Sequence, residues 1–544
     1  MRKLAAVAAV ALATLQQAIP APDIVVVNAR VFTGDTATPW AEAVSISGSR
    51  IARVGSTVDL RASAGAETRV IDANGRLLIP GINDAHAHPG AEPDSVTLDG
   101  PPAVQHDPSL DEVIARIGVA LSKAKPGQWI FGEIGAAVLE DPRATRATLD
   151  SLTDGHPLLL DAWTGHGTIA NTAALRILGI KEDEPDPPGG FYARQADGRT
   201  LTGLAHEYAD YRMRRRLAMI PARTEQVGAF AAHARQATAF GITSVQAMMT
   251  AYPTDTIAEV LASVDLPVRL RLIDFPLTPM AQWREPIARR ITTQSPLITI
   301  SGTKWILDGT PIERGMLLSA DYADKPGAKG FRNFPDADLR EFLRRALAAH
   351  EQPMLHAVGD GAIGGLLDAL EGTGGDAWKP LRPRIEHGDM LQAQDFARAA
   401  RMGVTIVQNP AHFMIPEVFT ARIGPQRTAR TTQVKNMIEA GVPFAIGSDG
   451  PMNPFLNIMF ATINANNPSQ ALTVEQALRA YTSGSAAAEF AERDKGMLKG
   501  GMLADMALLS QDIFKIPPSE LPRTVSVLTI VNGKVVHSSE GGHQ

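Results

Sequence analysis

Eight short apolar runs, separated by stretches with helical character, constrain the fold of this chain more than any other feature. Strands that alternate with helices form parallel βαβ units, and eight such units close into a barrel. We therefore predict an α/β fold, a distorted TIM-like (β/α)8 barrel. The predicted strands are Ile82–Ala87, Gly241–Gln246, Val268–Ile273, Leu297–Ile306, Pro353–Ala357, Arg384–His387, Gly403–Val407 and Pro443–Ile446.

The chain is longer than such a barrel needs. The barrel is predicted to span residues 81–495, whereas roughly 250 residues are typical. We explain the excess by an inserted subdomain at about 92–235, after the first strand, with a strand of its own at Leu158–Trp163. Residues 22–80 and 496–544 instead carry short β-rich runs and Asn-Gly turn pairs. Both termini are therefore predicted to form one small β-sandwich domain together.

The first residues resemble a secretory signal peptide. Basic residues at Met1–Lys3 precede the apolar run Leu4–Leu15 and a small residue, Ala21, which is the pattern of a cleaved signal peptide. An alanine-rich first helix is the alternative. With residues 1–21 as a signal peptide, we expect a periplasmic or secreted protein. No later segment reaches the roughly 20 apolar residues of a membrane-spanning helix.

The amino-acid composition excludes several classes of functional site and argues against one class of partner. The 544 residues include no cysteine, which excludes disulfides, zinc–thiolate sites, iron–sulfur clusters and thiol nucleophiles. The formal net charge of −6, without a long block of like charge, argues against nucleic acid as a partner. The 13 histidines must therefore supply the soft ligands of any metal. Whether the protein forms a homo-oligomer stays open.

Titratable side chains gather where the predicted strands end. Function in a parallel barrel lies at the carboxyl ends of the strands. His86 and His88 end the first strand two residues apart, so both imidazoles point the same way. Each candidate alone is more simply structural, but their shared position predicts a metal site at the barrel mouth. The other strand-end candidates are Lys304, His356, His387 and Asp449, from the fourth, fifth, sixth and eighth strands.

These motifs resemble those of the amidohydrolase superfamily, and within it the branch that contains the N-substituted formamide deformylases. The resemblance implies that His86, His88, His356 and His387 bind metal. It also implies that Lys304 is a carboxylated lysine bridging two metals, and that Asp449 is both ligand and general base. The matching stretches are Leu78–His88, Lys304–Gly309, His356–Asp360, Arg384–His387, Ser448–Asp449 and Gly501–Asp505.

The expected activity is metal-dependent hydrolysis of a carbon–nitrogen bond, of the amide type, in a small-molecule substrate by metal-activated water. One or two divalent ions are expected, with zinc the first choice for histidine and carboxylate ligands. Asp449 would move the proton, and His387 or His166 would help to stabilise the oxyanion.

Two other functions stay open at this point. One is a heterocycle deaminase with a single metal, which a Lys304 without carboxylation would favour. The other is a non-catalytic binding or regulatory protein that keeps the barrel. An ordinary ion pair between Lys304 and Asp308 is the alternative to carboxylation.

Several weaker candidates surround this set. His166 is either near the substrate or a structural histidine, and His412 is placed to face the site from the seventh strand. Arg314, just past the fourth strand, is a candidate to bind a carboxylate. The roles of Glu207, Arg314 and His412 stay open. The G-x-G-x-x-G pattern at Gly359–Gly364 lacks the acidic partner of a dinucleotide site, so we interpret it as a tight strand-to-helix turn. The arginine-rich helix near Arg212–Arg216 is interpreted as a solvated face.

Overall fold

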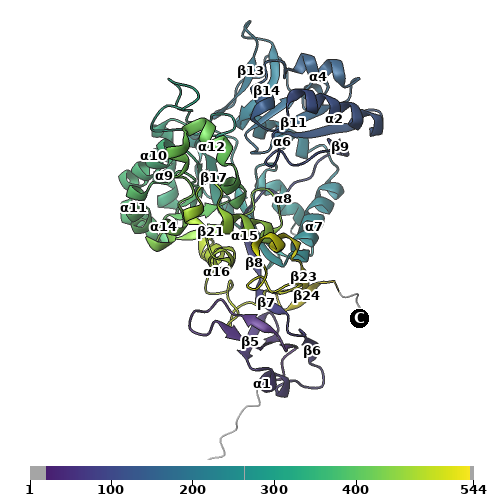
Figure 1. The fold of residues 1–544 in the computed structure, drawn as a ribbon, viewed down its shortest axis with the longest axis vertical. Coiled ribbons are helices and arrows are strands. Elements are labelled where there is room, and N and C mark those ends of the chain that lie inside the picture. The colour runs from purple at the N-terminus through teal and green to yellow at the C-terminus, as the bar shows by residue number, and fades with distance from the viewer. Residues whose placement is uncertain (1–19, 262–263, 294, 540–544) are drawn as a thin grey trace, which may run out of the picture.

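The computed structural model describes residues 20–261, 264–293 and 295–539. The predicted signal peptide therefore lies outside the described residues, apart from its last two positions. Figure 1 shows three regions along the long axis: a β-rich region at the bottom, the barrel in the middle and the inserted segment at the top. Among the described residues, no helix is long and apolar enough to cross a bilayer.

Within the described residues, eight strands form a parallel sheet in the order β21-β20-β19-β18-β17-β16-β15-β8. Every predicted barrel strand is present, and the predicted fold class is confirmed. Strands buried on both faces read as apolar runs, which explains why the sequence located them. The bounds are β8 Ile82–Ala87, β15 Ile242–Met248, β16 Arg269–Asp274, β17 Ile298–Ile306, β18 Pro353–Ala357, β19 Arg384–His387, β20 Thr405–Gln408 and β21 Phe444–Ile446.

The barrel closes without a regular ladder between β8 and β21. The Asp449 amide donates to the His86 carbonyl at 2.9 Å, and the Ser448 amide donates to Asp84 Oδ1 at 2.8 Å. Gly447 makes this approach feasible, because a Cβ there would overlap the backbone and Cβ of His86. The last strand therefore ends directly against the histidine-bearing first strand.

Helices cover the outside of the barrel. In α9 (Asp336–Ala349) the buried residues Leu339, Phe342, Leu343 and Ala346 recur every three or four positions, so one face packs on the sheet. The turn from β18 to α10 (Asp360–Thr373) contains Gly359, where a Cβ would overlap the Leu317 carbonyl. The glycine-rich pattern is thus a close backbone packing, as predicted. Further covering helices are α11 (Phe396–Arg401), α14 (Val434–Glu439), α15 (Pro454–Ile463) and α16 (Val474–Arg479).

Both chain ends contribute to the β-rich region. One sheet has the order β5-β4-β1-β6, and the other has the order β24-β23-β22-β7-β2-β3. Strand β7 pairs antiparallel with β22, which joins the N-terminal half of the region to the C-terminal half. Val26, Ile46, Leu78 and Leu508 belong to one shared core between the sheets. The domain bounds stay predictions. The strands are β1 Ile24–Val27, β2 Arg30–Phe32, β3 Trp40–Ala41, β4 Ala43–Ser47, β5 Arg50–Gly55, β6 Arg69–Asp72, β7 Leu77–Pro80, β22 Met506–Leu509, β23 Ser526–Val531 and β24 Lys534–Ser538.

The segment after β8 builds a further sheet with the order β13-β14-β12-β11-β10-β9. Helices α2 (Leu110–Lys123) and α4 (Arg146–Leu152) pack on this sheet, and α6 (Tyr208–Ala218) and α7 (Arg223–Ala239) lead back to the barrel (Figure 1). The strands are β9 Ser95–Thr97, β10 Trp129–Ile134, β11 Leu158–Ala162, β12 Gly167–Ala170, β13 Gly190–Arg194 and β14 Leu201–Glu207.

The arginine-rich helix α6 corrects one prediction, because its arginines are not a solvated face. Arg216 pairs with Glu184 at 2.7 Å. Arg215 donates to the carbonyls of Met249 and Phe275 at 3.2 and 2.8 Å. Arg215 thus satisfies buried carbonyls of the barrel, whereas Arg216 binds within the inserted segment. Both roles depend on contacts distant in sequence, so they leave no local signal.

Candidate metal centre and active site

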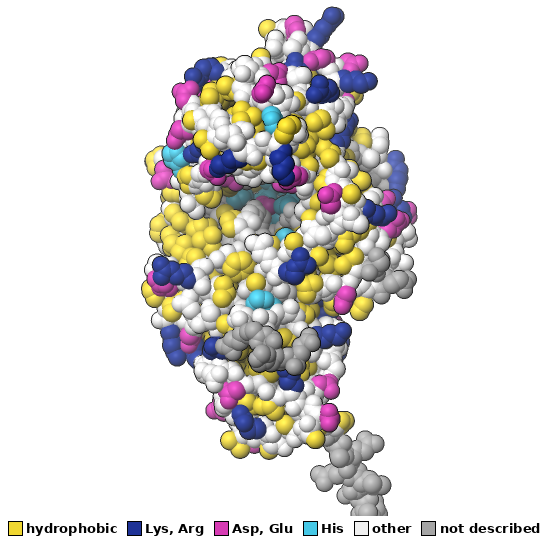
Figure 2. All heavy atoms as spheres, turned by 90° about the vertical axis from the view of Figure 1, so that its right-hand side faces the viewer, with side chains coloured by type: hydrophobic (Ala, Val, Ile, Leu, Met, Phe, Trp, Pro, Cys, Tyr) yellow, Lys and Arg dark blue, Asp and Glu magenta, His cyan; other side chains and the backbone are white. Residues whose placement is uncertain are grey.

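One cavity of about 380 Å³ lies at the carboxyl ends of the barrel strands. Figure 2 shows a hollow in this face, with histidine and acidic side chains at its floor. The structure brings all six predicted ligands to this cavity, although they come from five different strands or strand ends. They are His86, His88, Lys304, His356, His387 and Asp449.

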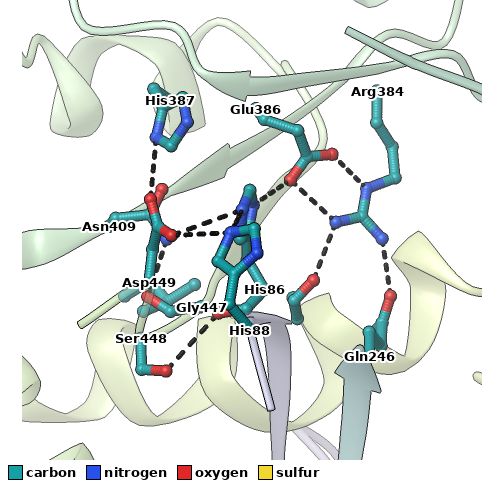
Figure 3. Close-up of polar contacts among 12 residues, drawn as sticks. His86, His88, Gln246, Arg384, Glu386, His387, Asn409, Gly447, Ser448 and Asp449 are labelled. Carbon is teal, nitrogen blue, oxygen red and sulfur yellow. Dashed lines mark hydrogen bonds and ion pairs between the residues drawn. The ribbon is translucent and has the colours of Figure 1, made fainter. Parts of the chain in front are cut away.

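His86, His88 and Asp449 form the first group of ligand atoms (Figure 3). Asp449 Oδ1 lies 3.0 Å from His88 Nε2 and 3.5 Å from His86 Nε2. The two Nε2 atoms are 3.1 Å apart. One atom from each residue lies within 4.8 Å of the others, so this group has the compactness to hold a cation.

His387, His412 and Asp449 form a second group with the same compactness. Asp449 Oδ2 lies 3.7 Å from His387 Nδ1, so its two oxygens face different histidine groups. The His412 ring stacks on the His387 ring at a centroid distance of 4.9 Å. His412 Nδ1 donates to Asp389 Oδ2 at 3.0 Å, which leaves Nε2 as the nitrogen available to a metal. The sequence had left the role of His412 open.

Two buried histidine nitrogens indicate that a cation fits this site. His356 Nε2 and His387 Nδ1 are buried without a hydrogen-bond partner among the described residues. Burial, together with neighbouring histidines, lowers the pKa of both imidazoles well below the ordinary value. Both rings are therefore neutral at neutral pH and carry a free lone pair. Buried polar atoms are rarely left without a partner, and a divalent cation is the partner that this donor set suits.

Glu386 and Arg384 fix the orientation of the His86 ring through its Nδ1 atom. Glu386 Oε2 accepts from His86 Nδ1 at 2.6 Å, which directs Nε2 into the cavity. Arg384 binds the same carboxylate with Nε and Nη2 at 2.8 and 3.0 Å (Figure 3). Although burial opposes it, Arg384 keeps the pKa of Glu386 below its usual value, so the carboxylate stays ionised. Burial lowers the pKa of His86 itself to about 4.

The sequence reasoning gave Glu386 no role at the metal. The available signal was its spacing, because Arg384 and Glu386 are two residues apart on β19 and so share the face that looks into the barrel. His387, next along the strand, would by alternation face away. Its backbone instead has a positive φ of 70°, followed by Gly388 at 66°, which lets the ring reach the cavity.

We expect Glu386→Gln to weaken metal binding by roughly ten- to hundredfold, because losing the anionic acceptor of a ligating histidine usually has this effect. The measurement is metal titration of protein first stripped of metal. The substitution also leaves Arg384 buried without its anion, so Arg384→Met combined with Glu386→Gln is the control for that separate destabilisation. Unchanged affinity in both variants would show that Glu386 does not position His86.

Lys304 lies at the floor of the cavity and forms no ion pair with any described residue. The alternative pairing with Asp308 is wrong. Asp308 instead accepts hydrogen bonds from the amides of Leu317, Val358 and Gly359 at 2.8, 3.0 and 3.0 Å. Burial lowers the pKa of Lys304 to about 8, against the opposing effect of Glu386, so an appreciable fraction of this amine is unprotonated near neutral pH.

The inserted segment contributes His166 to the cavity. Its ring lies 4.5 Å from the His356 ring, measured between centroids. His166 Nδ1 donates to Glu207 Oε1 at 3.0 Å, and Asn333 Nδ2 donates to Glu207 Oε2 at 3.0 Å. Burial alone would lower the pKa of His166, but Glu207 raises it above the ordinary value. Glu207 is thus a positioning residue, and the protonated ring that it favours carries a hydrogen on His166 Nε2.

Arg314 does not join this site. It pairs with Glu140 and Asp324, at 2.8 and 2.9 Å, and it does not line the cavity. Arg314 is thus not placed to bind a carboxylate in the cavity, because its guanidinium pairs with these two protein side chains instead. Its contacts join the inserted segment to the loop after β17.

The chain is similar to known proteins along most of its length. The family model described as the amidohydrolase family matches residues 69–537. N-substituted formamide deformylase of Arthrobacter pascens is 27% identical over 554 residues, which cover 95% of this chain and 99% of that protein. Protein LONG AFTER FAR-RED 3 of Arabidopsis thaliana is 26% identical over 544 residues, covering 95% and 91%. An uncharacterized metal-dependent hydrolase from Pyrococcus furiosus shares the fold, with a TM-score of 0.68 and 22% identity over 90% of this chain and 100% of that one.

Proposed function

The chain belongs to the amidohydrolase family, and from this membership we propose that it hydrolyses the carbon–nitrogen bond of a small N-substituted amide. The observation that carries the proposal is the convergence of neutral imidazoles and one ionised carboxylate, Asp449, on a single cavity. Similarity to a protein named as an N-substituted formamide deformylase supports amides, and formamides first, as the substrates to test.

The metal ligands we propose are the four cavity histidines of the predicted set together with Asp449, with zinc as the first ion to test. A divalent cation at this position supplies a Lewis acid and lowers the pKa of a bound water from 15.7 to about 7. The two Asp449 oxygens face separate histidine groups, which supports a site for two ions. The ligands are His86, His88, His356, His387 and Asp449, with Lys304 added if it is carboxylated.

The side chains of the cavity have distinct tasks in the proposed reaction. Asp449 accepts the proton of the attacking water and returns it to the leaving amine. His166 in its protonated form donates from Nε2 to the carbonyl oxygen as negative charge develops there, and Glu207 holds the ring in that orientation. The aromatic side chain of Trp163 and the thioether of Met452 also line the cavity and keep bulk solvent, other than the attacking water, away from the amide.

The proposed carboxylation of Lys304 makes a specific prediction. A carbamate on its amine would supply two oxygens and a negative charge, so we expect Lys304→Ala to lose the second equivalent of metal and most activity. Bicarbonate with a short carboxylic acid is expected to restore part of that activity by filling the space of the carbamate. Metal analysis and rate measurements on one preparation check this. Two full equivalents of metal in Lys304→Ala would contradict it.

A screen of amides on metal-stripped and reconstituted protein tests the proposed function. We expect reconstitution to restore release of a substituted amine from N-substituted formamides or acetamides. A set of aminated heterocycles belongs in the same screen. Release of ammonia from those compounds alone would favour the deaminase alternative, and no turnover of any compound by metal-loaded protein would overturn the proposal.

A further inference from the structure

The cavity has a second group of polar side chains, apart from the histidines of the metal centre. Tyr211 and Arg214 are three residues apart on α6, so they share one helix face, and His233 comes from α7. All three line the cavity. We call them the distal wall.

The distal wall has unused hydrogen-bonding capacity. Only 6% of Tyr211 is exposed, and its hydroxyl makes no hydrogen bond to any residue that the structure describes. Its ring lies edge-on to the His166 ring, at a centroid distance of 6.1 Å. His233 likewise makes no hydrogen bond within the described part of the chain, and burial lowers its pKa, which keeps it neutral. The Tyr211 hydroxyl opens onto the cavity, so it is available to hydrogen-bond a ligand group there.

Arg214 adds a hydrogen-bond donor whose positive charge is already balanced by neighbouring carboxylates. Its Nε donates to Asp210 Oδ2 at 2.9 Å, and its Nη2 donates to Asp161 Oδ1 at 3.2 Å. Nη1 has no partner among the described residues. Burial raises the pKa of Asp210. Even with Asp210 protonated, Asp161 alone balances the guanidinium, and Glu92 adds a further carboxyl group nearby.

Hydrogen-bond donors whose charge is balanced by nearby carboxylates favour a ligand that accepts hydrogen bonds but carries no charge. A carboxylate would be attracted by an unpaired guanidinium, but here it would also meet the field of Asp161. An apolar group would leave the Tyr211 hydroxyl and Arg214 Nη1 without partners, which costs binding energy. An uncharged oxygen acceptor, such as an amide carbonyl, satisfies both donors without adding charge.

We propose that the distal wall is a specificity subsite for an uncharged hydrogen-bond acceptor carried on the N-substituent of the substrate, bound by Tyr211 Oη and Arg214 Nη1. The inference rests on the proposed amide hydrolysis, because it concerns the part of the substrate away from the cleaved bond. The inserted segment therefore selects substrates, while the barrel supplies the metal ligands.

Three matched substrates test the subsite on the zinc-reconstituted full chain. They are N-benzylformamides whose meta position carries isopropyl, carboxamide or carboxylate. We expect kcat/KM for the carboxamide to exceed that for the isopropyl compound by roughly ten- to hundredfold, the scale of leaving a buried hydrogen-bond donor without its partner. The carboxylate is expected to fall below the carboxamide by about tenfold, since its charge faces Asp161.

Two conservative variants locate the preference. Tyr211→Phe removes only the hydroxyl, and Arg214→Lys keeps a cation for Asp210 but removes the free Nη1. In each we expect the carboxamide-to-isopropyl ratio to fall at least about threefold, which is the scale of one neutral hydrogen bond. Arg212→Lys is the matched control, because Arg212 lies on the same helix, pairs with Glu184 and does not line the cavity.

The outcomes separate the two proposals. Hydrolysis of all three compounds at similar rates, a preference for the carboxylate, or a carboxamide preference that survives in both variants would overturn the subsite and leave amide hydrolysis standing. If metal-loaded wild-type protein hydrolyses none of the three, nor any amide of the broader screen, the proposed function itself fails.

Discussion

His86→Ala and His88→Ala are each expected to remove at least one equivalent of bound metal and nearly all amide hydrolysis. The two Nε2 atoms are 3.1 Å apart and both face Asp449 Oδ1, so losing either one leaves the first ligand group incomplete. The measurement is metal content per folded protein, together with kcat on the same sample.

The two variants differ in how strongly they are expected to destabilise the fold, so at least one of them can test the ligand role. The His86 side chain is 1% exposed and its replacement removes one of the donors to the buried Glu386, whereas the His88 side chain is 34% exposed. His88→Ala should therefore fold even if His86→Ala does not. His106→Ala is the control, since His106 is an exposed histidine that pairs with Glu112 away from the cavity. Full metal content and retained activity in His88→Ala would contradict a ligand role.

Asp449→Asn is expected to bind metal near the normal stoichiometry but to lose roughly 10²–10⁴-fold in kcat, the usual scale of general acid–base catalysis. Although burial opposes it, the neighbouring His86 and His88 keep the pKa of Asp449 below its ordinary value, so it is ionised at neutral pH. Asparagine keeps the shape and one oxygen, but it cannot accept and return a proton.

A purely structural aspartate would respond differently to this substitution. Thermal stability would fall while turnover per folded molecule stayed unchanged, so metal content, melting temperature and kcat on one preparation separate the two roles. Asp368→Asn is a suitable control because Asp368 is exposed and pairs with Arg398 on the outer surface. Unchanged kcat in Asp449→Asn would remove Asp449 from the proposed mechanism.

Much of the fold can be predicted from the sequence because the patterns that specify it lie within short segments. Buried parallel strands appear as short apolar runs, and the eight observed strands agree with the predicted ones to within a few residues. The family resemblance is confirmed by the match over residues 69–537. The position of His86, His356 and Lys304 at a common mouth follows from strand order alone, because the carboxyl ends of parallel strands meet at one end of a barrel.

The finer parts of the site depend on contacts between residues far apart in the chain. His387 and Asp449 reach the cavity through left-handed backbone conformations, with φ of 70° and 43°, at residues where alternation along a strand has already ended. No sequence pattern places Arg215 of α6 at two carbonyls of the barrel or brings Arg214 of the same helix to the cavity.

The sequence by itself therefore determined the order of the elements, the barrel and the gathering of titratable residues at its mouth, because periodicity and strand-end position are properties of short segments. Only the tertiary structure decided how those ligands are held. The carboxylate of Glu386 reaches His86 across 300 positions of the chain, and Gly447 lets the last strand close against the first. Such contacts are selected by packing and by the need to pair every buried polar group, which act on the folded molecule as a whole.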